Sequence, residues 1–193
     1  MHGVMNRAVQ CLITDVWGAA VWRAVAQEAG QQPAEVPGRR DAARTARQLA
    51  TAAAHLGRTP DCLLEDLGTY LVSHPARAGI RRLLRFGGSD FRDFLHSLED
   101  LPERGRLALP DLLLPPISVS DQGAGRYALG IGPGGAGLGP LLTGLLRAMA
   151  DDYGALVLID PCVEGPGGAA TIRLSLLEPR FATPRAFALS VPR

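Results

Sequence analysis

The hydrophobic pattern of the chain changes period near residue 110, and this change restricts the possible fold more than any single motif. Before that point apolar residues recur every three or four positions, for example over residues 63–71, as in an amphipathic helix. After it, short runs rich in β-branched residues and leucine lie between glycine-rich turns. Helices followed by strands indicate an α+β fold, with residues 1–110 mainly helical and residues 111–180 forming a sheet plus one helix.

The second half is expected to hold a four-stranded antiparallel sheet and one helix. The helix is predicted over Pro140–Tyr153, where leucines recur at helical spacing. Residues 1–193 are expected to form a single domain, because this length suits one hydrophobic core, and residues 181–193 form a tail with no predicted structure. The predicted strands are 117–119, 127–131, 155–160 and 171–177.

One helix of the first half is rich in alanine. Asp41 is a suitable N-cap for it, and Gly57 is a suitable end. Its small residues recur at helical spacing and are predicted to form one face of the helix. The residues of that predicted face are Ala43, Ala46, Ala50 and Ala53.

Composition excludes several classes of function. The net charge is +1, which gives no electrostatic reason to expect nucleic acid or an acidic membrane surface as a partner. The chain has no lysine, so neither a Schiff-base lysine nor a P-loop lysine is available. The three cysteines form no C-x-x-C pair, and no run of about 18 apolar residues occurs. The expectation is a soluble cytoplasmic protein without a membrane span, a disulfide framework or catalytic residues.

The stretch from Asp90 to Leu101 is the most regular helical pattern in the chain. Asp90 is a suitable N-cap, and Pro102 is expected to end the helix. At about 100° per residue, His96 lies on the opposite side from the apolar residues, so it is expected to be exposed to solvent. The apolar stripe consists of Phe91, Phe94, Leu95, Leu98 and Leu101.

This stretch resembles a known family. Leu83–Leu101, which reads LLRFGGSDFRDFLHSLEDL, is similar to the segment of haem-NO/oxygen-binding (H-NOX) domains that carries the iron ligand. Trp17–Trp22, which reads WGAAVW, also resembles an early segment of that family. The resemblance covers essentially the whole chain and implies a helical part followed by a helix and a four-stranded sheet. At the position of the family's iron-binding histidine this chain has Pro102, which offers no metal ligand.

The glycine-rich loop after residue 131 has two interpretations. Gly132–Gly137 fits the G-x-G-x-x-G pattern of dinucleotide-binding loops, and Asp160 ends the next predicted strand. Too little chain follows for further parallel strands, so a structural loop is favoured. The resemblance instead places the family's Tyr-x-Ser-x-Arg motif, which holds the haem propionates, at Ile131, Pro133 and Gly135. If the motif starts at Tyr127, its other two positions are Leu129 and Ile131, which also lack the serine and the arginine.

The resemblance therefore implies a sensory or regulatory module, not an enzyme, and the two replaced motifs predict that it holds no haem. Its expected partner is a signalling protein such as a histidine kinase or a cyclic-dinucleotide enzyme. One alternative is a haem-binding NO/O2 sensor with an unusual ligand, for which His96 is the fallback metal candidate. A second alternative is a dinucleotide-binding enzyme that uses Gly132–Gly137. The expected pocket, open to a small apolar ligand, is lined by Met5, Val9, Leu98, Leu101 and Pro102.

Overall fold

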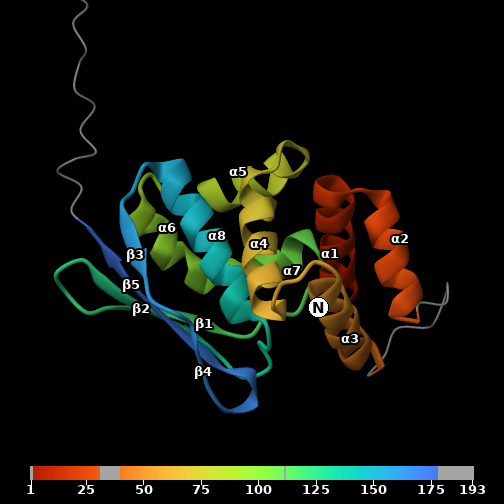
Figure 1. The fold of residues 1–193 in the computed structure, drawn as a ribbon. Helices are drawn as coiled ribbons and strands as arrows, with labels where there is room; N and C mark the ends of the chain where they lie inside the picture. Colours follow the sequence, from red (N-terminus) through yellow and green to blue (C-terminus); the bar gives the residue numbers. More distant parts are fainter. Residues whose placement is uncertain (1, 31–39, 111, 178–193) are drawn as a thin grey trace, which may run out of the picture.

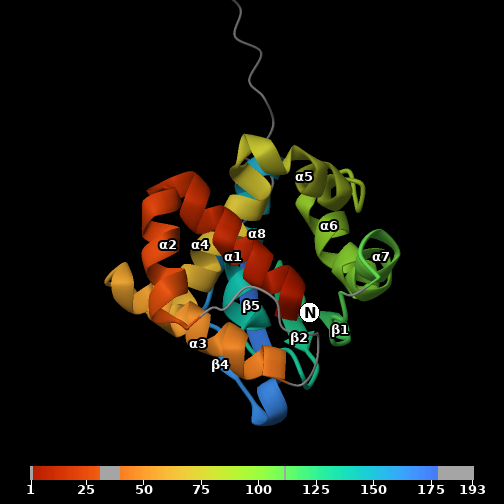
Figure 2. The ribbon, with the colours of Figure 1, turned by 90° about the vertical axis from the view of Figure 1, so that its right-hand side faces the viewer.

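The computed structural model describes residues 2–30, 40–110 and 112–177. Helices α1, α2 and α3 form one group, which Figure 1 shows on the right of the molecule, and α4 and α8 run side by side through its middle. The sheet lies below α8 in this view, and Figure 2 shows the same ribbon from the side of α1, α2 and α3. The predicted tail, 181–193, falls outside the described residues. The helices are α1 (His2–Trp17), α2 (Ala19–Glu28), α3 (Arg40–His55), α4 (Pro60–Ser73), α5 (Ala78–Arg85), α6 (Phe91–Ser97), α7 (Leu101–Ala108) and α8 (Leu138–Tyr153).

The sheet is antiparallel throughout, with the strand order β1-β2-β5-β3, and β4 also pairs with β5. Side chains alternate across it, so that Tyr127, Leu129 and Ile131 of β2 are buried together with Ile172 and Leu174 of β5. The expected α+β fold is confirmed, and the four predicted strands are present. A fifth strand, two residues long, was not predicted. The strands are β1 (Ile117–Asp121), β2 (Arg126–Ile131), β3 (Val157–Ile159), β4 (Val163–Glu164) and β5 (Ala170–Leu176).

Helix α8 lies against the sheet and is the most buried helix that the structure describes. On its other side it crosses α4 at a point where both helices have a glycine. A Cβ atom built on Gly144 would lie 1.9 Å from the carbonyl oxygen of Glu65, and one built on Gly68 would lie 2.0 Å from that of Leu141. The two backbones are therefore in direct contact, which a larger residue at either glycine would prevent.

The predicted helix over 90–101 is divided, and the prediction that Pro102 ends it was wrong. Helix α6 ends at Ser97, a 3-10 turn (η2) covers Leu98–Asp100, and Pro102 lies in the first turn of α7. The first turn of a helix tolerates proline because its backbone N–H groups have no intrahelical partner. The predicted cap is present: the Asp90 side chain accepts a hydrogen bond of 2.9 Å from the Asp93 amide.

The small face predicted for α3 is not the face that the helix buries. Ala46 and Ala50 are exposed, whereas the buried positions of this helix include Gln48, Ala52 and Ala53. The side chain of Ala43 lies outside the described residues. Alanine marks a helix face weakly, because it is accepted on both the buried and the exposed side. No helix among the described residues is long and apolar enough to cross a membrane.

Candidate functional site

The predicted pocket residues belong to one apolar region. Val9 of α1 and Leu98 of η2 are fully buried members of the main core, and Met5 and Leu101 pack against it while partly exposed. Pro102 directly follows Leu101 in the chain, is half-buried and lies at the start of α7. These side chains therefore contribute to the packing of the domain, and their contact with an apolar ligand stays a prediction.

Polar contacts tie this segment to the sheet. The Glu99 carboxylate accepts a hydrogen bond of 2.8 Å from the backbone amide of Val119, on β1. On α7, Nη2 of Arg104 donates to the Ser97 carbonyl oxygen at 3.4 Å. The turn before Pro102 is thus held by both the sheet and α7.

His96 is exposed, as predicted, and lies away from the apolar stripe. Its ring meets the ring of Tyr127 edge to face, with the ring centroids 6.1 Å apart. At the start of the same helix, the Ser89 hydroxyl donates to Oδ2 of Asp93 at 2.8 Å, and the Ser89 amide donates to the same oxygen at 3.2 Å. The hydroxyl first, and then the amide, lower the pKa of the Asp93 carboxyl.

The glycine-rich loop joins β2 to α8 and packs closely. A Cβ atom built on Gly135 would lie 2.8 Å from Cγ2 of Ile131 and 3.0 Å from Cγ of Pro115. The Gly132 amide donates to Pro116 and the Gly134 amide donates to Gly167, so these two donors are already engaged. The strand after α8 joins the sheet beside β5 in an all-antiparallel order, which lacks the adjacent parallel strands of a dinucleotide-binding fold.

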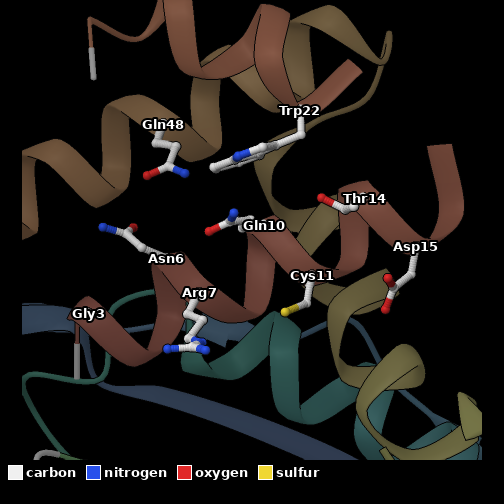
Figure 3. Close-up of a pocket in the computed structure, with 9 residues that line it drawn as sticks. All are labelled: Gly3, Asn6, Arg7, Gln10, Cys11, Thr14, Asp15, Trp22 and Gln48. Atoms are coloured by element: carbon white, nitrogen blue, oxygen red, sulfur yellow. The ribbon is translucent and has the colours of Figure 1, made fainter. Parts of the chain in front are cut away.

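A pocket of about 420 Å³ lies along α1, between that helix and α2 and α3, and the sequence did not predict it. Figure 3 shows carboxamide side chains from α1 and α3 turned toward one another, with the indole of Trp22 extending from α2 above them. No local pattern of the sequence signals it, because its lining residues come from separate helices. The pocket is lined by Gly3, Asn6, Arg7, Gln10, Cys11, Thr14, Asp15, Trp22 and Gln48.

At one end of this pocket, the lining residue Asp15 is bound by a tyrosine of α4. The Tyr70 hydroxyl donates a hydrogen bond of 2.5 Å to the Asp15 carboxylate and accepts one of 3.0 Å from Nε of Arg77. Burial first, and then the Asp15 carboxylate, raise the pKa of the Tyr70 hydroxyl. Asp15 is therefore already paired, and α1 is fixed to α4 at this end.

Comparison with known protein families gives one decisive result. The sequence model of the haem-NO-binding (HNOB) family matches residues 2–160 of this chain. The chain belongs to the haem-NO-binding family. It is an H-NOX domain, and the domains of this family are sensory or regulatory modules. A comparison with curated protein sequences gives no match.

Solved H-NOX structures share the fold along nearly all of their length. An H-NOX protein from S. oneidensis in the Fe(II) ligation state has a TM-score of 0.74 at 13% identity, covering 92% of this chain and 97% of that one. The Fe(II) unliganded H-NOX protein from K. algicida has a TM-score of 0.70 at 18% identity, with coverage of 92% and 97%. For a mutant of the T. tengcongensis H-NOX the TM-score is 0.72 at 14% identity, with coverage of 94% and 100%. The predicted architecture is confirmed at low sequence identity.

Proposed function

We propose that this H-NOX domain works without haem, as a regulatory module that controls a partner signalling protein. The observation that carries the proposal is Pro102, which stands where the family resemblance expects the iron-binding histidine. A proline side chain has no donor atom for a metal, and here it occupies the first turn of α7. The nearest histidine along the chain, His96, is exposed on the side of α6 away from the apolar stripe.

The loop before α8 supports the same proposal. The resemblance places the propionate-binding arginine at Gly135, where a Cβ atom would already lie within 3.0 Å of Ile131 and Pro115. Contacts this short force neighbouring atoms to move, so an arginine is not accommodated without rearrangement. Ile131, at the position of the motif's tyrosine, is 3% exposed and belongs to the core. These residues do not fit a haem held in the manner of the family.

An absorption spectrum tests the proposal directly. The purified domain is expected to be colourless, and titration with hemin is expected to give no Soret band that saturates at one equivalent. Such a band in the wild-type protein would refute the haem-free assignment. If the band were then lost in His96→Ala, the protein would be a haem sensor with an unusual ligand.

A matched pair of variants sharpens the test. Pro102→His supplies an imidazole beside the apolar region of Leu98 and Leu101, and is expected to give weak haem uptake because a ligand has been restored without the propionate contacts. Pro133→His adds the same group at an exposed position and is expected to behave as wild type. Equal uptake by both variants would mean that binding is adventitious and that the segment around Pro102 has no special role.

Helix α5 supplies a surface suited to the proposed partner. Phe86, directly after this helix, is 92% exposed, and Leu83 and Ile80 are 41% and 37% exposed on it. Exposed apolar side chains of this size mark contact surfaces more often than chance, and exposed arginines at 81, 82 and 85 surround them. The proposed partner is a histidine kinase or a cyclic-dinucleotide enzyme. Arg81 and Arg85 are already paired with Asp152, so Arg82 is the arginine of this helix that suits an acidic contact on the partner.

The partner proposal is tested by adding the domain to a kinase or cyclic-dinucleotide enzyme of its own organism. The domain is expected to change the rate of autophosphorylation or of cyclic-dinucleotide turnover, and Phe86→Ser is expected to abolish the change. Leu113→Ser removes another exposed apolar side chain, 68% exposed, at a distant position of the chain and serves as the control. No effect of the wild-type domain on any such enzyme would contradict the proposal.

A further inference from the structure

The pocket along α1 contains a buried amide that has no partner. Gln48 is 1% exposed, yet neither Oε1 nor Nε2 has a hydrogen-bond partner among the residues that the structure describes. A buried polar group left in this state destabilises a protein, so such groups are nearly always paired with protein, water or ligand. Figure 3 shows the Gln48 amide directed into the space between α3 and α1. The side chain is therefore placed to bind something that enters the pocket.

The remaining groups around Gln48 share one chemistry. Asn6 and Gln10, from successive turns of α1, bring two more carboxamides to the same pocket, and each carboxamide offers one acceptor oxygen and an NH2 donor. Trp22 adds an indole ring that extends over Gln10 toward Gln48. The inner part of the pocket thus combines paired donors and acceptors with an aromatic surface, and it carries no charge.

The charged residues of the pocket lie elsewhere. In Figure 3, Arg7 and Asp15 are on the side of α1 away from Gln48, and both are exposed. Asp15 is already bound to Tyr70. An ionic ligand would find no counter-charge beside the three amides, so the group that fits there is neutral and polar at its edges.

We propose that this pocket binds the adenine ring of a nucleoside or nucleotide. Adenine presents a donor and an acceptor side by side, at N6 and N7, which is the complement of a carboxamide, and glutamine and asparagine are its usual bidentate partners. Its flat faces stack on aromatic side chains, here Trp22. Guanine presents two adjacent acceptors at O6 and N7, one of which would face an amide oxygen. The pocket volume of about 420 Å³ lies within the range of small-ligand sites.

This site is separate from the residues on which the haem-free proposal rests. It is built from α1, α2 and α3, whereas Pro102 and Gly135 lie in α7 and the loop before α8. A hemin titration therefore does not bear on it, and each proposal can fail without the other.

Calorimetric titration of the full chain with adenosine, AMP and guanosine tests the proposal. Adenosine is expected to bind saturably in the micromolar range, with guanosine at least about tenfold weaker because of the mismatched edge. AMP binding as tightly as adenosine would assign the site to the nucleoside, and tighter AMP binding would assign it to the nucleotide, with a phosphate contact outside the three amides. No saturable binding of either adenine compound, or equal binding of guanosine, would overturn the proposal.

Variants locate the binding. Gln48→Leu and Trp22→Leu are each expected to weaken adenosine binding about tenfold or more, since one removes the bidentate amide and the other the stacking surface. Asn6→Leu, at a less buried position, keeps the test valid if Gln48→Leu does not fold. Gln27→Leu makes the same substitution on the exposed side of α2 and is expected to bind as wild type. Wild-type affinity in Gln48→Leu and Asn6→Leu, or a soaked crystal with only water beside Gln48, would refute the assignment.

Discussion

The contact between α4 and α8 gives the sharpest prediction for stability, through the substitution Gly144→Ala. The added methyl group would lie 1.9 Å from the carbonyl oxygen of Glu65 and 2.7 Å from its carbonyl carbon. Both atoms belong to the backbone of α4 and cannot turn aside as a side chain does. The helices must therefore separate by about 1.5 Å, because an ordinary van der Waals contact of this kind begins at about 3.4 Å.

The magnitude follows from what that separation removes. Overpacking a well-filled core costs about 1–3 kcal/mol, and a gap of about 1 Å forfeits up to half of the dispersion energy of the neighbouring contacts. The hydrogen bond of 3.3 Å from the Thr69 hydroxyl to the Gly144 carbonyl is lost as well, at about 1 kcal/mol. The higher helix propensity of alanine returns about 1 kcal/mol. The last two terms cancel, so the net expectation is a loss of about 1–3 kcal/mol in the free energy of unfolding, equivalent to a Tm lower by about 2–12 °C.

Thermal unfolding followed by circular dichroism, with urea unfolding as a second measure, checks this value. Gly79→Ala in α5 is the matched control, because a Cβ atom there meets nothing within 4 Å and its Tm is expected to stay level or rise slightly. A Gly144→Ala protein as stable as wild type would show that the two helices do not touch as described.

Three further predictions concern single side chains. Tyr70→Phe removes the hydrogen bond to the Asp15 carboxylate and is expected to lower the free energy of unfolding by about 1–2 kcal/mol in urea. Because the pKa of Asp93 is lowered in the folded state, its ionised form stabilises the fold above about pH 4, and this contribution is lost as the pH falls through the folded pKa. Asp93→Asn is therefore expected to have a lower Tm than wild type at pH 7, by a margin that shrinks as the pH falls below about 4. Burial raises the pKa of the Cys162 thiol, so a maleimide is expected to label the exposed Cys62 first at about pH 7.5, as peptide mapping would show.

The sequence predicted the elements well wherever a strong apolar period marked them. The leucines of Pro140–Tyr153 define α8 almost to its ends, because a buried helix shows its period clearly. The alternation in β2 and β5 likewise marks the buried face of the sheet. The two-residue strand β4 was missed, because two residues are too few to show an alternation.

Two failures have a common cause, since each concerns a residue that is compatible with two environments. Pro102 is compatible with both the end of one helix and the first turn of the next, and only the packing of α7 decides between them. Gln48 is polar and lies outside the predicted small face of α3, yet it is almost fully buried. Its pocket partners come from α1, far earlier in the chain, so no local pattern could bring them together.

The hydrogen bond between Glu99 and Val119 has a consequence for how the segment around Pro102 can be observed. Val119 lies on β1, an edge strand, and its outward amide would be open to water without the Glu99 carboxylate. Any movement of the turn at residues 98–100 withdraws that carboxylate and leaves the amide free to exchange its hydrogen with solvent. The hydrogen-exchange rate of the Val119 amide therefore reports whether the turn at residues 98–100 has moved. It can be measured at the edge of the sheet without a label in the core.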